Sequence, residues 1–282
     1  MKITSSRLSH PIDAAKARVL GEIVDLCRDE PSQPMLVGAF ARDLWLWNRH
    51  GIETIRATQD VDISMEFPDW AGYERFSSKL RGNGFDVEDI THPERLTHGA
   101  TSVEVDLLPF GGLSEDGATI TWPVDGLRWG ICGFVESYAN AGWCELEGDG
   151  KGIRVASLAA IVMLKIIAVS ETPGRRKKDA ADINLIMTNY YAAGNKSRLM
   201  SSGPESWIMD AVGGDMIQAS SMLLGMDIGR IANPGTRSLL EGILENETKG
   251  STECPLAREL ARGSFTRARV LLKNLKAGVE RA

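Results

Sequence analysis

One ten-residue stretch restricts the fold of this chain more than any other. In residues 58–67, TQDVDISMEF, apolar side chains take the odd positions from Val61 onwards and polar side chains take the even ones. Strict alternation predicts a β-strand with one face in the core and one face more open. The open face carries Asp60 and Asp62, which repel each other unless a cation binds there. An acidic surface strand is the commoner explanation for an isolated pair.

Composition is that of a globular protein with a sizeable core, 43% hydrophobic and 25% charged. The net charge of −6 argues against non-specific nucleic-acid binding, although it leaves room for a local basic site. The cysteines lack metal-site spacing, which favours free thiols in a reducing compartment. They are Cys27, Cys132, Cys144 and Cys254.

The first ten residues lack the apolar segment of a signal peptide. The longest apolar run, residues 158–169, is too short to span a bilayer and contains a lysine. We therefore expect a cytoplasmic protein without membrane association.

Two halves of different character are predicted. Periodicity predicts helices over residues 12–26, 39–49 and 70–80, and strands over 34–37, 59–67, 85–90 and 101–110. Further strands are expected over 118–124, 131–138, 143–148 and 153–157, as a β-rich extension of the sheet. The remainder is helical, with linkers at 195–206 and 249–255. The predicted class is α+β: a mixed sheet with flanking helices in 1–156, followed by a helical half in 157–282.

Three aspartates are candidates for a cation site. Residues two apart on a strand point the same way and lie roughly 6.5–7 Å apart, so Asp60 and Asp62 can face one divalent ion or two. Asp106 lies on the polar face of another predicted strand. Carboxylate oxygens suit Mg²⁺, which also takes phosphate oxygens as ligands. If the two strands are neighbours, the three aspartates form a magnesium site; otherwise they belong to an acidic surface.

Upstream of this strand, residues 34–49 predict a buried strand, a glycine and the beginning of a helix. Such a corner presents backbone N–H groups and the helix dipole to an anion. Gly38 permits close backbone approach, and Arg42 can reach a phosphate from the first turn. The alternative is an ordinary strand–helix corner with a solvated arginine.

Cations of the helical half form a third candidate element. Lys165 is the only charged residue in 158–169, and a buried ammonium is costly without an anionic partner unless it reaches solvent from a helix edge. Residues 175–178 are four consecutive cations, followed by Asp179 and Asp182 on one side of a helix. Such a run suits a triphosphate or an RNA backbone, and a solvated loop is the alternative.

Taken in order, GAFARDLWL, TQDVDI and Asp106 resemble the nucleotidyltransferase core of the DNA polymerase β superfamily. The first two segments are also similar to the opening of CCA-adding tRNA nucleotidyltransferases. MLKIIAV and RRKKDAADI resemble a K-L-x-A…R-x-K-D-x-x-D-L segment of AbiEii/MenT-like nucleotidyltransferases, which are toxins of abortive-infection and toxin–antitoxin systems. The likeness covers about residues 34–187, and it implies a polymerase-β-like mixed sheet.

The resemblance implies a role for each matching residue. Asp60 and Asp62 would ligate metal, and Asp106 would be the third carboxylate, ligating metal or accepting the proton of the attacking hydroxyl. Lys165 would hold the triphosphate, and Asp179 would complete the site from the helical half.

Nucleotide binding is assigned to a glycine and three cations: Gly38, Arg42, Lys165 and Lys178. The superfamily often has a second glycine and then a serine or threonine after Gly38, whereas this chain has Ala39 and Phe40. A hydroxyl that could contact a phosphate is therefore missing.

The expected activity is transfer of a nucleoside monophosphate from a nucleoside triphosphate to an acceptor hydroxyl, with release of pyrophosphate. The expected cofactor is Mg²⁺, as two ions, with Mn²⁺ as an alternative. The expected partners are the triphosphate, a tRNA or other RNA acceptor, and a cognate antitoxin protein. Two alternatives are a non-catalytic nucleotide-binding or antitoxin-like module and an aminoglycoside-type small-molecule nucleotidyltransferase.

Overall fold

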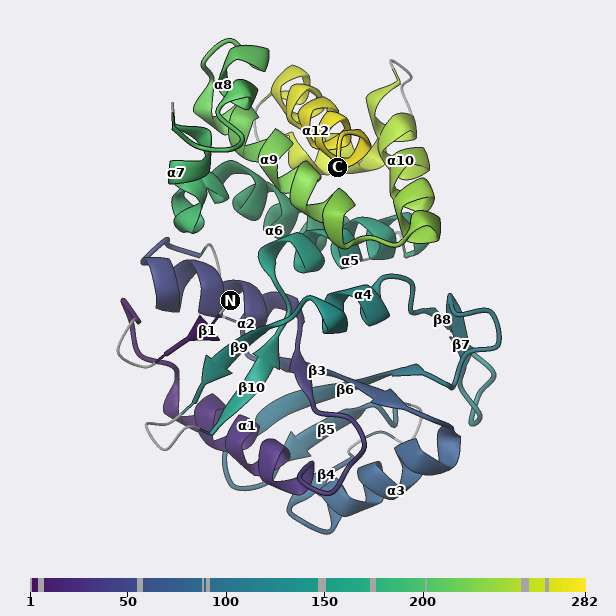
Figure 1. Ribbon diagram of the computed structural model, residues 1–282. Coiled ribbons are helices and arrows are strands. Elements are labelled where there is room, and N and C mark those ends of the chain that lie inside the picture. Colours follow the sequence, from purple (N-terminus) through teal and green to yellow (C-terminus); the bar gives the residue numbers. More distant parts are fainter. Residues whose placement is uncertain are drawn as a thin grey trace. The chain divides into compact units, whose positions relative to one another are not determined.

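The chain forms two compact units, Met1–Ser157 and Leu158–Ala282, in the computed structural model (Figure 1). The described residues are 2–4, 8–54, 58–87, 89, 92–146, 151–172, 176–200, 202–249, 254–261 and 264–282, without the side chains of Lys2 and Arg176. The first unit is mixed α/β and the second is helical, which confirms the predicted α+β class. The units divide one residue after the predicted boundary.

An eight-stranded mixed sheet organises the described part of the first unit. Its order is β1-β9-β10-β2-β3-β6-β5-β4. The pairs β1/β9, β10/β2 and β3/β6 are parallel, and the other pairs are antiparallel. The strands are β1 (Lys2–Ile3), β2 (Met35–Leu36), β3 (Val61–Phe67), β4 (Phe85–Asp86), β5 (Arg95–His98), β6 (Val103–Gly111), β9 (Gly142–Glu145) and β10 (Gly152–Val155).

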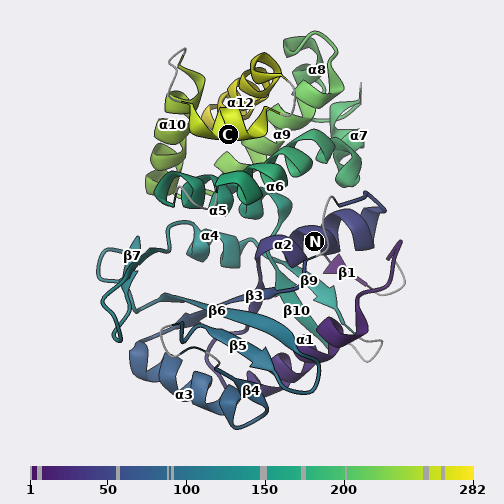
Figure 2. The same ribbon diagram turned by 180° about the vertical axis from the view of Figure 1, so that it is seen from behind.

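Helices cover both faces of this sheet, as Figures 1 and 2 show together. The apolar residues that alternate along β3 form the contacts on one covered face. The buried Met65 contacts Cys27 at the end of one helix, and Phe67 packs on Phe76 of another. These two helices are α1 (Ala14–Leu26) and α3 (Trp70–Arg81). On the other face lie α2 (Gly38–Asp43), its π-helical continuation η2 (Leu44–Arg49), and α4 (Phe134–Ala139).

The β-rich extension predicted for residues 111–156 is only partly correct. Its later strands, β9 and β10, join the main sheet, but β7 (Thr119–Thr121) and β8 (Arg128–Gly130) form a separate two-stranded sheet. The strand predicted over 131–138 is wrong, because that segment contains α4. Phe134 and Tyr138 have helical spacing, and both rings pack on Phe110 of β6.

The second unit is built on a close pair of helices, α9 (Met216–Ile231) and α12 (Phe265–Glu280), which meet backbone to backbone at Gly225 and Gly278. Part of the predicted linker 195–206 is helical. In the second predicted linker, 249–255, residues 250–253 lie outside the described residues. No described helix is long and apolar enough to cross a membrane. The other helices are α5 (Leu158–Glu171), α6 (Arg176–Asn189), η4 (Tyr191–Asn195), α7 (Lys196–Leu199), α8 (Trp207–Ala211), α10 (Pro234–Thr248) and α11 (Pro255–Leu260).

Candidate active site

The predicted metal strand is β3, and its apolar residues fix it in the core. Val61 and Ile63 are fully buried, while Asp62 between them is half-buried on the opposite face. Asp60 lies immediately before the strand and is also half-buried. A strand anchored through one face holds its other side chains in defined directions, which a pair of ligands requires.

Gly38 brings the beginning of α2 against the carboxylate of Asp62. The N–H of Val37 donates a 2.9 Å hydrogen bond to the backbone carbonyl of Asp62. Gly38 has φ +67°, and a Cβ atom at this position would lie 1.9 Å from Oδ2 of Asp62. The glycine is therefore required both by its backbone conformation and by the space that the aspartate occupies.

Asp106 is the direct neighbour of Asp62. The two residues are register partners in the parallel pair β3/β6, and neighbouring strands lie about 4.8 Å apart. Partners in register point to the same face, so two carboxylates lie side by side on the polar face of the sheet. Asp106 also contacts Arg95 of β5, whose Nε lies 3.2 Å from Oδ1.

The donor chemistry of this face fits a hard divalent cation, because Asp62 and Asp106 present adjacent carboxylates and Asp60 precedes Asp62 by two residues. The three aspartates do not, however, form a complete metal site in the structure. Among the described residues, no three histidine, cysteine, aspartate or glutamate side chains form a group able to hold a metal ion. The residues therefore fit Mg²⁺ in type and strand position, while the third carboxylate is engaged by Arg95.

Arg42 does not lie where the sequence interpretation placed it. Its side chain is 1% exposed, and its Nε and Nη2 donate to Oδ1 of Asp43 at 2.8 and 2.6 Å. The other carboxylate oxygen of Asp43 accepts a hydrogen bond from Thr58. Arg42 thus stabilises the link between α2 and the segment that leads into Asp60, and it is not exposed for binding a phosphate.

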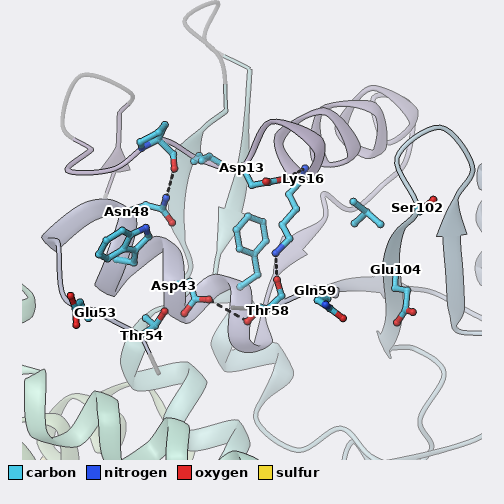
Figure 3. Close-up of a pocket in the computed structure, with 15 residues that line it drawn as sticks. Asp13, Lys16, Asp43, Asn48, Glu53, Thr54, Thr58, Gln59, Ser102 and Glu104 are labelled. Atoms are coloured by element: carbon cyan, nitrogen blue, oxygen red, sulfur yellow. Dashed lines mark hydrogen bonds between the residues drawn. The ribbon is translucent and has the colours of Figure 1, made fainter. Parts of the chain in front are cut away.

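A cavity of about 1020 Å³ adjoins this link (Figure 3). Its walls come from the beginning of α1, from α2 and η2, from the segment before β3 and from the beginning of β6. Lys16 donates to the Thr58 carbonyl and lies over the Phe40 ring. Among the described residues, the lining includes Gln59 and Glu104 rather than Asp60 and Asp106. Its carboxylates are Asp13, Asp43, Glu53 and Glu104.

The two lysines that were assigned to nucleotide binding in the second unit differ in exposure. The ammonium of Lys165 is 2.6 Å from Asp179 and 2.9 Å from Asp182, and all three side chains are largely buried. Burial lowers the pKa of Lys165, but the two carboxylates more than offset this effect and hold it above its ordinary value. Lys178 is exposed, and Arg175 lies outside the described residues. Lys165 thus has the anionic partners that a buried ammonium requires.

Sequence reasoning missed Arg95 and left Asp182 without a role. Arg95 belongs to β5, a strand that was not predicted because only Leu96 and His98 are buried in it. Its pairing with Asp106 depends on the register of β5 on β6, which no local sequence pattern indicates. The sequence signal for the role of Asp182 was its position three residues after Asp179, which places both aspartates on the same side of a helix.

No family model and no curated protein matches the chain. Among solved structures, the antibiotic-resistance factor ANT(2″)-Ia in solution has 15% identity and a TM-score of 0.36, over 72% of this chain and 92% of its own. A crystal structure of ANT(2″)-Ia with adenylyl-2″-tobramycin has the same identity and score, over 66% and 100%. A tRNA-processing enzyme in an apo form has 12% identity and a TM-score of 0.27, over 96% and 91%. Likenesses this weak identify no family.

Proposed function

We propose that the chain is a metal-dependent nucleotidyltransferase whose reacting groups lie on the polar face of β3 and β6. The observation that supports this most is the packing of Gly38, Asp62 and Asp106. A buried strand pair holds two carboxylates side by side, and a glycine with a left-handed backbone makes room for one of them. An acidic surface strand would need neither the glycine nor the register.

The proposed reaction joins an acceptor hydroxyl oxygen to the α-phosphorus of a nucleoside triphosphate and breaks the bond to pyrophosphate. Divalent cations bound at the aspartates would stabilise the attacking and leaving oxygens. Asp60 and Asp62 orient the phosphate end of the nucleotide, and Asp106 accepts the hydroxyl proton or serves as a further ligand. The roles proposed for Lys165 and Asp179 rest on the sequence resemblance alone. The contacts of Lys165 in the structure do not support them, because its partners are carboxylates of its own unit.

For the acceptor we propose RNA, with tRNA first, and for the biological role a toxin restrained by an antitoxin. Both rest on the resemblance of residues 164–183 to AbiEii/MenT-like enzymes. One observation favours a second acceptor class. Among the described residues, the lining of the cavity has four carboxylates, one of which (Asp43) is paired with Arg42, and one lysine, a balance that suits a cationic small molecule such as an aminoglycoside.

The test is a transfer assay with each labelled nucleoside triphosphate, Mg²⁺ and total RNA. Parallel reactions omit RNA, or replace it with an aminoglycoside. Label on RNA supports the main proposal, and label on the drug alone supports the second acceptor class. No label in any reaction supports a non-catalytic nucleotide-binding module and contradicts the proposal.

Two variants of β3 make the assay specific. Asp62→Asn should abolish transfer and leave the fold intact. Glu66→Gln is the matched control, since Glu66 lies on the same face of the same strand but is exposed. Turnover retained in Asp62→Asn would contradict the metal assignment.

The toxin role has its own test. Expression of the wild-type chain in a bacterial host should arrest growth, and Asp60→Ala should relieve the arrest at equal protein level. Arrest that persists in Asp60→Ala would separate any toxicity from nucleotide transfer.

A further inference from the structure

Three charged side chains form a row across neighbouring strands β3, β6 and β5. Asp62 is the register partner of Asp106 in the parallel pair, and Asp106 is the register partner of Arg95 in the antiparallel pair. Directly paired residues share a face of the sheet, with Cβ atoms about 5 Å apart in an antiparallel pair. Asp106 therefore lies between a carboxylate on one side and a guanidinium on the other.

The contact between Arg95 and Asp106 is direct. Nε of Arg95 lies 3.2 Å from Oδ1 of Asp106, whose side chain is only 15% exposed. Two adjacent carboxylates on a half-buried face repel each other, and an arginine beside one of them reduces this repulsion. In the structure, Arg95 thus supplies positive charge to Asp106 from the side opposite Asp62.

A guanidinium and a divalent cation compete for the same carboxylate oxygens. Asp106 is the proposed third carboxylate, yet no three-carboxylate group is assembled among the described residues. We propose that Arg95 is an internal counter-ion that must release Asp106 before this carboxylate joins the metal site. The inference rests on the proposed function, and it makes Arg95 a positioning residue that acts through Asp106.

The surroundings of Arg95 suit release. Its side chain is 53% exposed, so the guanidinium can move into solvent without opening the core. The next residue, Leu96, is fully buried and keeps the strand in place. Release therefore requires side-chain rotation alone, and the competition raises the cation concentration at which Asp106 leaves Arg95.

The test is Mn²⁺ binding to the full chain, measured by titration calorimetry, since Mn²⁺ replaces Mg²⁺ at oxygen sites and binds more tightly. Arg95→Gln should bind Mn²⁺ roughly two- to fivefold more tightly, which is the effect of losing one partly exposed ion pair. Without metal, the same variant should melt at a lower temperature than wild type. Arg95→Lys, which keeps the charge, should restore most of the wild-type affinity.

Two controls separate a specific contact from a general change of charge. Arg128→Gln also removes one cation from the first unit, from an exposed arginine that faces Asp116, and it should leave Mn²⁺ affinity unchanged. In an Asp106→Asn background, Arg95→Gln should have no effect, whether the two Asp106→Asn proteins bind weakly or not at all. Unchanged or weaker binding in Arg95→Gln alone overturns the inference. An effect that persists without Asp106 also overturns it.

The two proposals fail in distinguishable ways. If the binding cycle behaves as expected but no nucleotide is transferred to any acceptor, the counter-ion role stands and the proposed reaction does not. If transfer depends on Asp62 while Arg95→Gln leaves Mn²⁺ affinity unchanged, the reaction stands and the counter-ion role does not.

Discussion

Oδ2 of Asp62 occupies the space where a side chain on Gly38 would have to begin, 1.9 Å from the position of a Cβ atom. This contact joins the beginning of α2 to the polar face of β3. The contact accounts for the glycine at the strand–helix corner. A general preference for flexible residues at corners is a weaker explanation. The position of the proposed metal ligand therefore depends on a residue that carries no side chain.

Gly38→Ala should destabilise the protein and abolish nucleotide transfer. The left-handed backbone at φ +67° costs an alanine roughly 1–2 kcal/mol, and displacement of Asp62 adds to that cost. Gly117→Ala is the matched control, because Gly117 has φ +69° and no atom within 4 Å of its Cβ position. Urea denaturation of both variants measures the difference. Equal losses of stability would show that the contact with Asp62 has no energetic weight.

Local patterns predicted the parts of the site that lie within single elements. Alternation placed Val61 and Ile63 in the core and Asp62 on the other face, because the period of a strand is a property of the sequence itself. The position of Asp106 beside Asp62 was conditional on strand order, which the sequence does not encode locally. The register of β3 on β6 supplies that missing information.

The surroundings of two arginines could not be predicted from the sequence. Arg42 was expected to reach a phosphate from the first turn of a helix, with a solvated side chain as the alternative, but Asp43 pairs with it and the surrounding fold buries it. Arg95 belongs to a strand whose buried positions are too few to be recognised. In both cases the decisive partner or cover comes from tertiary packing, and no periodicity in the neighbouring residues indicates it.

Lys165→Met should lower the free energy of unfolding by about 3–5 kcal/mol at neutral pH, because Asp179 and Asp182 would be left buried and without their cation. Urea denaturation is the measurement. Adding Asp179→Asn and Asp182→Asn to this variant removes the uncompensated charges and should recover most of the loss. If Lys165→Met is as stable as wild type, the cluster does not stabilise the second unit.

The same cluster predicts a dependence on alkaline pH. The pKa of Lys165 is held above its ordinary value of 10.5, so its contribution is fully present below that pH and is lost as the pH rises through the folded-state value. The stability difference between wild type and Lys165→Met should stay constant up to about pH 10 and shrink above it. A difference that shrinks between pH 7 and 9 would contradict the raised pKa.

Asp227 should make the second unit sensitive to acid. Burial raises the pKa of Asp227, but hydrogen bonds from Arg198 and Tyr190 outweigh it and lower the pKa below its ordinary value. The contribution is therefore present at neutral pH and is lost as the pH falls below about 4. Asp227→Asn should cost roughly 3 kcal/mol at pH 7 and much less in acid, by urea denaturation. Glu241→Gln, which removes an acidic residue that faces Arg237 one helical turn away, should have little effect at either pH.

Gly225→Ala tests the packing of α9 on α12. A Cβ atom on Gly225 would lie 2.0 Å from the backbone carbonyl oxygen of Leu275 and 3.1 Å from the Cα atom of Gly278, so the helices would have to separate. Overpacking of this kind should cost about 3 kcal/mol. Gly242→Ala makes the same change inside α10, where no atom lies within 4 Å, and should stabilise the protein by roughly 0.5–1 kcal/mol through helix propensity. Urea denaturation should therefore give opposite signs for one substitution in two helices. A Gly225→Ala variant as stable as wild type would mean that close backbone contact does not hold this pair of helices together.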